Sequence, residues 1–116
     1  MAIPPRDIFN LEDFLNRMMD DRELAKSILD EFLSGLPGKL EAIANFIAEG
    51  NTREVSVLAH LIKGESASVG ADNLSKAACV LELAAKAGNT AELAGNLPAL
   101  RENALLFMKT IAETVI

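Results

Sequence analysis

The sequence predicts an all-α domain, an antiparallel four-helix bundle with a short additional N-terminal helix. Three observations support this fold class. Ala and Leu, both strong helix formers, dominate a composition that is 50% hydrophobic. Helix-start signals recur along the chain, and apolar residues follow helical spacing between them. No alternating, β-branched stretch indicates a strand. Short connections between long amphipathic helices favour antiparallel neighbours, hence the bundle.

The helix starts are marked by Asn or Asp followed three residues later by an acid. At such a position a side-chain oxygen can accept from the first free backbone amides, and the acid faces the positive end of the helix dipole. The pairs are Asn10 with Asp13, Asp20 with Glu23, Asn51 with Glu54 and Asn89 with Glu92, and Asp72 is a fifth candidate cap. The corresponding helices are expected at residues 11–19, 21–49, 52–69, 72–87 and 90–114.

Proline interrupts two of these expected helices. Pro37, flanked by Gly35 and Gly38, lies in the middle of the second one. A proline inside a helix removes one backbone hydrogen bond and crowds the preceding turn, so we expect a kink or a break there. Pro98 should disturb the early part of the last helix for the same reason.

Composition and charge disfavour several classes of protein. The length of 116 residues suits one domain, 1–116, of which 1–6 are expected to be a flexible leader. A net charge of -6 argues against a nucleic-acid surface, which needs clustered Lys and Arg. Cys79 is the single cysteine, so no internal disulfide can form, as in a reducing cytoplasm. No apolar run reaches the roughly 20 residues that span a bilayer, and the first residues lack the pattern of a secretory signal. We therefore expect a cytoplasmic protein without direct membrane insertion.

The only histidine, His60, falls on the side of its helix away from the expected core. At 100° per residue, the apolar residues of this helix lie about 160° to 220° from His60. These core candidates are Val55, Leu58, Ile62 and Val69. This arrangement disfavours a buried core histidine and leaves two alternatives, an incidental solvated side chain or a reactive one.

The neighbours of His60 favour the reactive alternative. Lys63 and Gly64 stand at i+3 and i+4, the positions that share a helical face with it. Lys63 can provide a positive charge beside an anion on the imidazole. Gly64 is costly inside a helix, about 1 kcal/mol relative to Ala, and its missing side chain leaves room for another molecule. The other residues of this face are Arg53, Ser56, Val57 and Ala67, and Leu61 adds apolar area beside it.

Imidazole itself points to phosphoryl transfer. An unperturbed imidazole is largely neutral near pH 7 and keeps a nitrogen lone pair that can accept a phosphoryl group. That reaction asks the protein mainly for positioning and for positive charge near the phosphoryl oxygens. No acidic metal cluster lies near His60 in the sequence, so we expect the chain to bind neither metal nor cofactor and the remaining catalytic groups to come from another protein.

The stretch AHLIKGESASVGADNLSKAACVLELAAKAG, residues 59–88, resembles the histidine-containing phosphotransfer (HPt) domains of multistep phosphorelays. The family pattern is a His, an apolar residue, Lys and Gly, then a small-residue turn ending in Gly-Ala, then a helix with a Leu and a Leu-Glu pair. The residues in those places are His60, Ile62, Lys63, Gly64, Ser66, Gly70, Ala71, Leu74, Leu81 and Glu82. The upstream ILDEFLSGLPGKLEAIANFIAEGN is similar to the second helix of the family, including its proline.

The resemblance implies a phosphate carrier without its own ATP site. Such domains accept a phosphoryl group from the aspartate of one receiver domain and pass it to another, and the receiver supplies the carboxylates and Mg²⁺. His60 would be the acceptor, Lys63 would stabilise the phosphate, and Gly64 would leave room for the receiver. The implied partners are receiver domains of response regulators or of a hybrid sensor histidine kinase, and we expect a monomer. The residues expected to bind them are Arg53, Ser56, Val57, Leu61 and Ala67.

Two features depart from the family pattern or lack an explanation. Leu61 occupies a position that is more often small or polar in the family, which could bias the choice of partner. Glu65 places an acid about 140° from His60, near the edge of the core face, and the sequence offers no reason for it.

Three other functions are alternatives to phosphotransfer. A helical adaptor that binds a partner without phosphoryl chemistry would have a similar composition, and His60 would then be incidental. A kinase or ATPase is disfavoured because no Gly-x-x-x-x-Gly-Lys-[Ser/Thr] loop is present. A metal enzyme is disfavoured because His60 and Cys79 make a weak ligand set, and Cys79 is better explained as a small packing residue.

Overall fold

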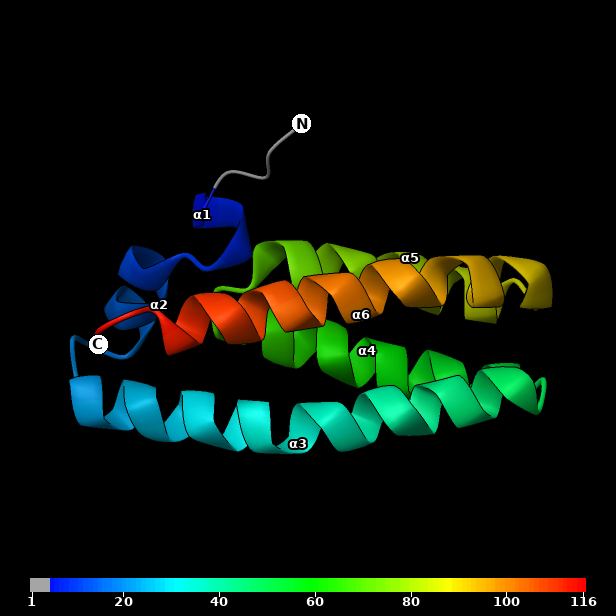
Figure 1. Cartoon of the computed structure of the whole chain (residues 1–116), viewed down its shortest axis with the longest axis horizontal. Helices are drawn as coiled ribbons and strands as arrows, with labels where there is room; N and C mark the ends of the chain where they lie inside the picture. The colour runs from blue at the N-terminus through cyan, green and yellow to red at the C-terminus, as the bar shows by residue number, and fades with distance from the viewer. Residues whose placement is uncertain (1–4) are drawn as a thin grey trace.

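The computed structural model describes residues 5–116, which form helices and no strand. Two short helices precede four long ones: α1 (Pro5–Ile8), α2 (Leu11–Arg17), α3 (Arg22–Ala48), α4 (Thr52–Ser68), α5 (Asp72–Lys86) and α6 (Thr90–Ala112). The long helices lie side by side, and successive ones run in opposite directions (Figure 1). Both α3 and α5 pack against α4 and against α6. The predicted all-α fold class is confirmed for the described residues.

The N-terminal segment contains a helix that the sequence did not predict. Pro5 and Arg6, expected to belong to a flexible leader, form the first turn of α1. A proline suits this position because the first amides of a helix have no partner within it. Residues 1–4 of the expected leader lie outside the described residues. In Figure 1 both short helices lie at the end of the bundle where α6 ends.

Three of the predicted caps are confirmed. The side chains of Asn10, Asn51 and Asn89 accept from backbone amides three residues on, at 3.1, 3.3 and 3.2 Å. The other two predictions are wrong. Asp21, not Asp20, caps α3, because Asp20 lies in the preceding turn with φ 59°. Asp72 is the first residue of α5, which has no side-chain cap, and its acid instead lies in the first turn where the helix dipole favours it.

Of the kink or break expected at Pro37, the break does not occur. A single helix, α3, runs through this position for 27 residues, and α6 likewise continues through Pro98. The reason is tertiary packing: Phe32 and Leu36 on one side of Pro37, and Ile43 on the other, are all buried in the bundle core. Burial of both halves offsets the missing backbone hydrogen bond, as is common for helices held by an apolar face.

The short N-terminal segment fixes the turn between α4 and α5. The Asn10 amide donates to the Gly70 carbonyl at 2.9 Å, and an added Cβ on Gly70 would lie 2.8 Å from the Asn10 carbonyl oxygen. Gly70 also has φ 78°, so glycine is required there on two counts. The ring of Phe9 packs edge-on against that of Phe107, with centroids 5.7 Å apart. These contacts join the N-terminal segment to the turn between α4 and α5, the two helices that carry the candidate site, and to α6.

Among residues 5–116, no helix combines the length and the apolar character that crossing a membrane would require.

Candidate functional site

His60 projects from the outer side of α4. Its side chain is 68% exposed, whereas Val55, Ala59 and Ile62 of the same helix are fully buried. The predicted orientation of His60, away from the core, is therefore confirmed. The core face itself is shifted slightly from the prediction, because Ala59 belongs to it and Leu58 is only partly buried.

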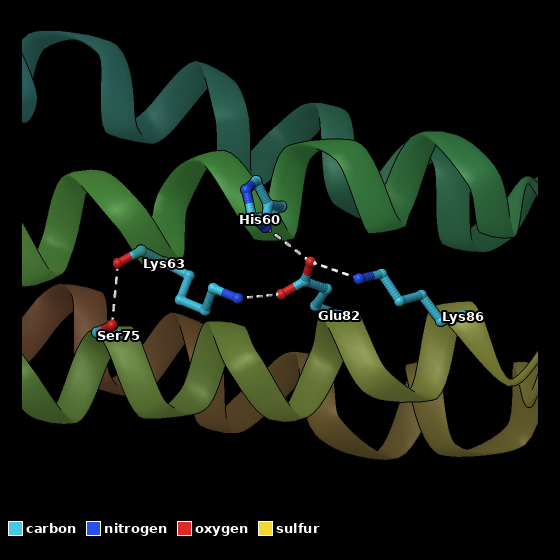
Figure 2. A network of polar contacts seen from close by, with 5 residues as sticks. All are labelled: His60, Lys63, Ser75, Glu82 and Lys86. Atoms are coloured by element: carbon cyan, nitrogen blue, oxygen red, sulfur yellow. Dashed lines mark hydrogen bonds and ion pairs between the residues drawn. The ribbon is translucent and has the colours of Figure 1, made fainter.

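The imidazole is held from the neighbouring helix by Glu82. This residue lies on α5 and its side chain is only 3% exposed. One carboxylate oxygen, Oε2, is 2.8 Å from His60 Nδ1 and the other, Oε1, is 2.6 Å from Lys63 Nζ. Lys86, one turn further along α5, places its Nζ 3.2 Å from Oε2. Figure 2 shows the carboxylate between the three donors. A buried acid with three nitrogen partners thus joins α4 to α5 under the histidine.

The sequence did not predict the contacts of Glu82, because this residue stands there only as part of the family pattern. A signal was nevertheless present, since Glu82 stands one turn after Ala78 and next to Leu81 on the apolar face of α5, where both of those residues are buried. A charged residue on a buried face requires partners, because an unpaired charge there would be strongly destabilising.

The other predicted face residues surround His60 on α4. Arg53, Val57, Gly64 and Ala67 are exposed, and an added Cβ on Gly64 would meet no atom within 4 Å. The apolar side chains on this face are those of Val57 and Leu61, 57% and 43% exposed, and Ser56 is half-buried. The space over Gly64, one turn from the histidine, is therefore open, as expected.

Lys63 is less exposed than the sequence predicts, and its ammonium group has a partner on α5. The sequence placed it on the solvent side as an ammonium beside the imidazole. Its side chain is 32% exposed and turns towards α5, where it pairs with Glu82. The structure therefore brings His60 and Lys63 together through a shared carboxylate.

Comparison with protein-family models matches residues 27–107 to the Hpt domain. The match covers most of the chain and includes His60, Glu82 and both lysines of the site. The chain belongs to the Hpt domain family. Domains of this family are phosphocarrier modules of phosphorelay signalling, which act with receiver domains and are not themselves catalytic enzymes. Searches of curated proteins and of solved structures gave no match to the chain.

The nitrogen partners of Glu82 in this HPt domain keep its carboxyl group ionised. The hydrogen bond from Lys63 lowers the pKa of Glu82 most, burial opposes it, and hydrogen bonds from Lys86 and His60 lower it further, to about 2. The hydrogen bond to Glu82 in turn raises the pKa of Lys63. Glu82 is therefore an ionised acceptor and Lys63 a charged donor at neutral pH.

This assignment determines which ring nitrogen of His60 is free. An ionised carboxylate has only acceptor positions, so Nδ1 must carry the hydrogen in the 2.8 Å contact with Glu82. A neutral imidazole then has its lone pair on Nε2. In Figure 2 this second ring nitrogen faces away from Glu82. The neutral imidazole of this HPt domain therefore keeps its lone pair on the ring nitrogen that is not in contact with Glu82, on a side chain that is 68% exposed.

The lowered pKa of Glu82 predicts a pH-dependent contribution to folding. Its ionised form is stabilised in the folded chain, so the contribution is present above pH 4.5, the ordinary value, and is lost as the pH falls towards 2. We expect about 1 kcal/mol, less than the full shift implies, because the partner lysines are partly exposed to solvent. Urea unfolding of wild type and Glu82→Gln between these pH values measures it. The two free energies of unfolding should converge on acidification, and a constant difference between them would contradict the assignment.

Two further contacts fix α4 in this HPt domain. Lys39 on α3 reaches Glu65 with 2.7 Å between Nζ and Oε1, which accounts for the acid that the sequence left unexplained. On the other side, the Ser75 hydroxyl of α5 donates to the Lys63 carbonyl at 2.9 Å (Figure 2). The helix that carries His60 is therefore tied to both of its neighbours by polar contacts as well as by the core.

In the described part of the chain, no group of three or more His, Cys, Asp or Glu residues is placed to hold a metal ion. Cys79 is half-buried on α5, three residues before Glu82.

Proposed function

We propose that His60 accepts a phosphoryl group from the aspartate of one receiver domain and passes it to the aspartate of another. The observation that carries this proposal is the exposed imidazole whose Nδ1 is tied to the buried Glu82, leaving Nε2 open to a partner. Membership of the Hpt domain family supports the same reaction class. The single cysteine and this role both fit a cytoplasmic protein.

In the first step Nε2 of His60 attacks the phosphorus of the receiver's aspartyl phosphate. A nitrogen–phosphorus bond forms as the bond from phosphorus to the aspartate oxygen breaks, and the aspartate carboxylate keeps the electron pair. Positive charge develops on the ring, which still carries its hydrogen on Nδ1. Glu82, with Oε2 2.8 Å from Nδ1, is placed to stabilise that charge. In the second step the carboxylate of another receiver attacks the phosphorus, and Nε2 recovers its lone pair.

The receiver would dock on the outer face of α4. This face contains the exposed apolar side chains of Val57 and Leu61 and the open space over Gly64. Apolar area beside a reactive group favours association with another protein surface. Arg53, Ser56 and Ala67 complete the proposed docking face. The receiver, belonging to a response regulator or a hybrid sensor histidine kinase, would supply Mg²⁺ and the catalytic carboxylates, and one monomer would bind one receiver.

Transfer from a labelled receiver tests the proposal. Receiver domains encoded in the same genome are phosphorylated with radiolabelled acetyl phosphate, freed of the excess donor and mixed with the wild-type chain. Label should move to the chain, and it should be lost in acid and retained in base, as a nitrogen–phosphorus bond requires. Mapping by mass spectrometry should place it on His60. If the folded chain takes no label from any of these receivers, the proposal fails and a helical adaptor is the better description.

Lys63→Ala is expected to slow transfer about tenfold, the size expected when one charge-assisted contact is lost from the transition state. Lys63 lies on the same side of α4 as His60 and carries a full positive charge, so it can turn from Glu82 to the transferred group. Single-turnover transfer from a phosphorylated receiver measures the effect. Lys63→Arg, which keeps the charge, should recover part of the rate, and unchanged kinetics in Lys63→Ala would rule out the proposed role.

A further inference from the structure

A shallow hollow lies beside the imidazole, between α4 and α5. Its volume is about 350 Å³ and it is lined by Ser56, Val57, His60, Glu82 and Lys86. It therefore combines an apolar wall, a hydroxyl, a buried carboxylate and an exposed ammonium with the reactive histidine. Lys63 does not line it, so among residues 5–116 the ammonium group in this hollow is that of Lys86.

Lys86 is the most weakly held partner of Glu82. Its Nζ is 3.2 Å from Oε2, whereas that of Lys63 is 2.6 Å from Oε1. Lys86 shares Oε2 with His60, and its side chain is 61% exposed, nearly twice the 32% of Lys63. An exposed ion pair of this kind contributes little stability. Lys86 can therefore leave Glu82 for another anion when the receiver docks, because His60 and Lys63 still hold the carboxylate at that stage. Lys63 turns to the phosphoryl group only in the transfer step, when the positive charge that develops on His60 strengthens its contact with Glu82.

The cluster around His60 has an excess of positive charge, whereas the chain as a whole is negative. The whole chain has a net charge of -6, but in this cluster two ammonium groups face one carboxylate. Arg53, exposed on the same side of α4 as His60, adds a further positive charge. The aspartyl phosphate and the catalytic carboxylates that the proposed function assigns to the receiver are anionic, and the net charge of this chain would repel them. Local positive charge at the docking face therefore favours their approach to the histidine.

We propose that Lys86 is a docking residue that binds an acidic side chain of the receiver at the rim of this hollow. The inference rests on the proposed function and extends the docking face from α4 onto α5. In the complex the Lys86 ammonium exchanges its contact with Glu82 for a carboxylate of the receiver beside the aspartyl phosphate. Lys86 acts on association, whereas His60 and Glu82 act on the transfer itself.

The test measures transfer rate against receiver concentration for Lys86→Ala and Lys86→Glu. Both variants should raise KM, by about fivefold for Ala and more for Glu, and both should leave kcat unchanged. The rise in KM should be smaller at high salt, because salt screens the interaction between exposed charges. Lys76 gives the matched control because it is exposed on the same helix, about 15 Å away along the axis. Lys76→Ala and Lys76→Glu make the same charge changes and should leave KM unchanged.

Three outcomes would overturn the inference. Lys86→Ala could behave as wild type, or its effect could equal that of Lys76→Ala, which would indicate only a change of net charge. Lys86→Ala could also lower kcat in the wild-type background and have no effect in a chain that carries Glu82→Gln. That result would show that Lys86 acts only through Glu82. Each of these outcomes requires that wild type be labelled on His60. Absence of that label is instead a failure of the proposed function, so the two failures are distinguishable.

Discussion

His60→Gln is expected to abolish acquisition of label from a phosphorylated receiver while leaving the fold intact. The amide of glutamine is not a nucleophile for phosphorus, and no second histidine exists in the chain. The side chain is 68% exposed, so its replacement removes little buried area. Glutamine can also donate a hydrogen bond towards Glu82, which keeps that buried acceptor satisfied. Transfer measured by gel autoradiography should fall below detection.

The control for this variant separates chemistry from folding. Circular dichroism and urea unfolding should place His60→Gln within about 1 kcal/mol of wild type, as expected for an exposed substitution. Lys76→Gln, an exposed substitution elsewhere, should keep full transfer. Acid-labile label on a folded His60→Gln chain would show that another residue is the acceptor, and the proposal would then be wrong.

Gly64→Gln is expected to reduce transfer by on the order of 100-fold, because the new side chain would fill the approach of a closely packed partner. Nothing lies within 4 Å of a Cβ at this position, so the side chain meets no atom of its own chain. Inside a helix Gln is favoured over Gly, and stability should hold or rise by up to about 1 kcal/mol. Binding to the receiver by titration calorimetry and single-turnover transfer measure the two effects together.

Gly95 provides the matched control for this substitution. It also lies inside a helix, α6, is exposed, and would meet nothing within 4 Å on gaining a Cβ. Gly95→Gln should raise stability similarly and leave transfer unchanged, and Gly64→Ala should have an intermediate effect on transfer. Normal receiver binding by a folded Gly64→Gln chain would show that this glycine does not serve access.

Local sequence was sufficient to predict most of the helices and the exposure of His60. Helical periodicity depends on residues within one or two turns, so the opposite positions of His60 and Ile62 could be derived from spacing alone. The asparagine caps could also be predicted from the sequence, because each hydrogen bond joins residues only three positions apart. The misplaced start of α3 is a local error, because both Asp20 and Asp21 can cap and only the turn conformation distinguishes them.

The sequence by itself determined an all-helical chain with one outward histidine, a lysine and a glycine one turn away, since each of these follows from short-range spacing. Only the tertiary structure decided how the histidine is oriented. Glu82 is 22 residues from His60, and their contact depends on the register of α5 against α4. Continuity through Pro37 and the pairing of Lys39 with Glu65 were likewise settled by packing between helices. Such contacts depend on the relative placement of two helices, which no periodicity within one helix can specify.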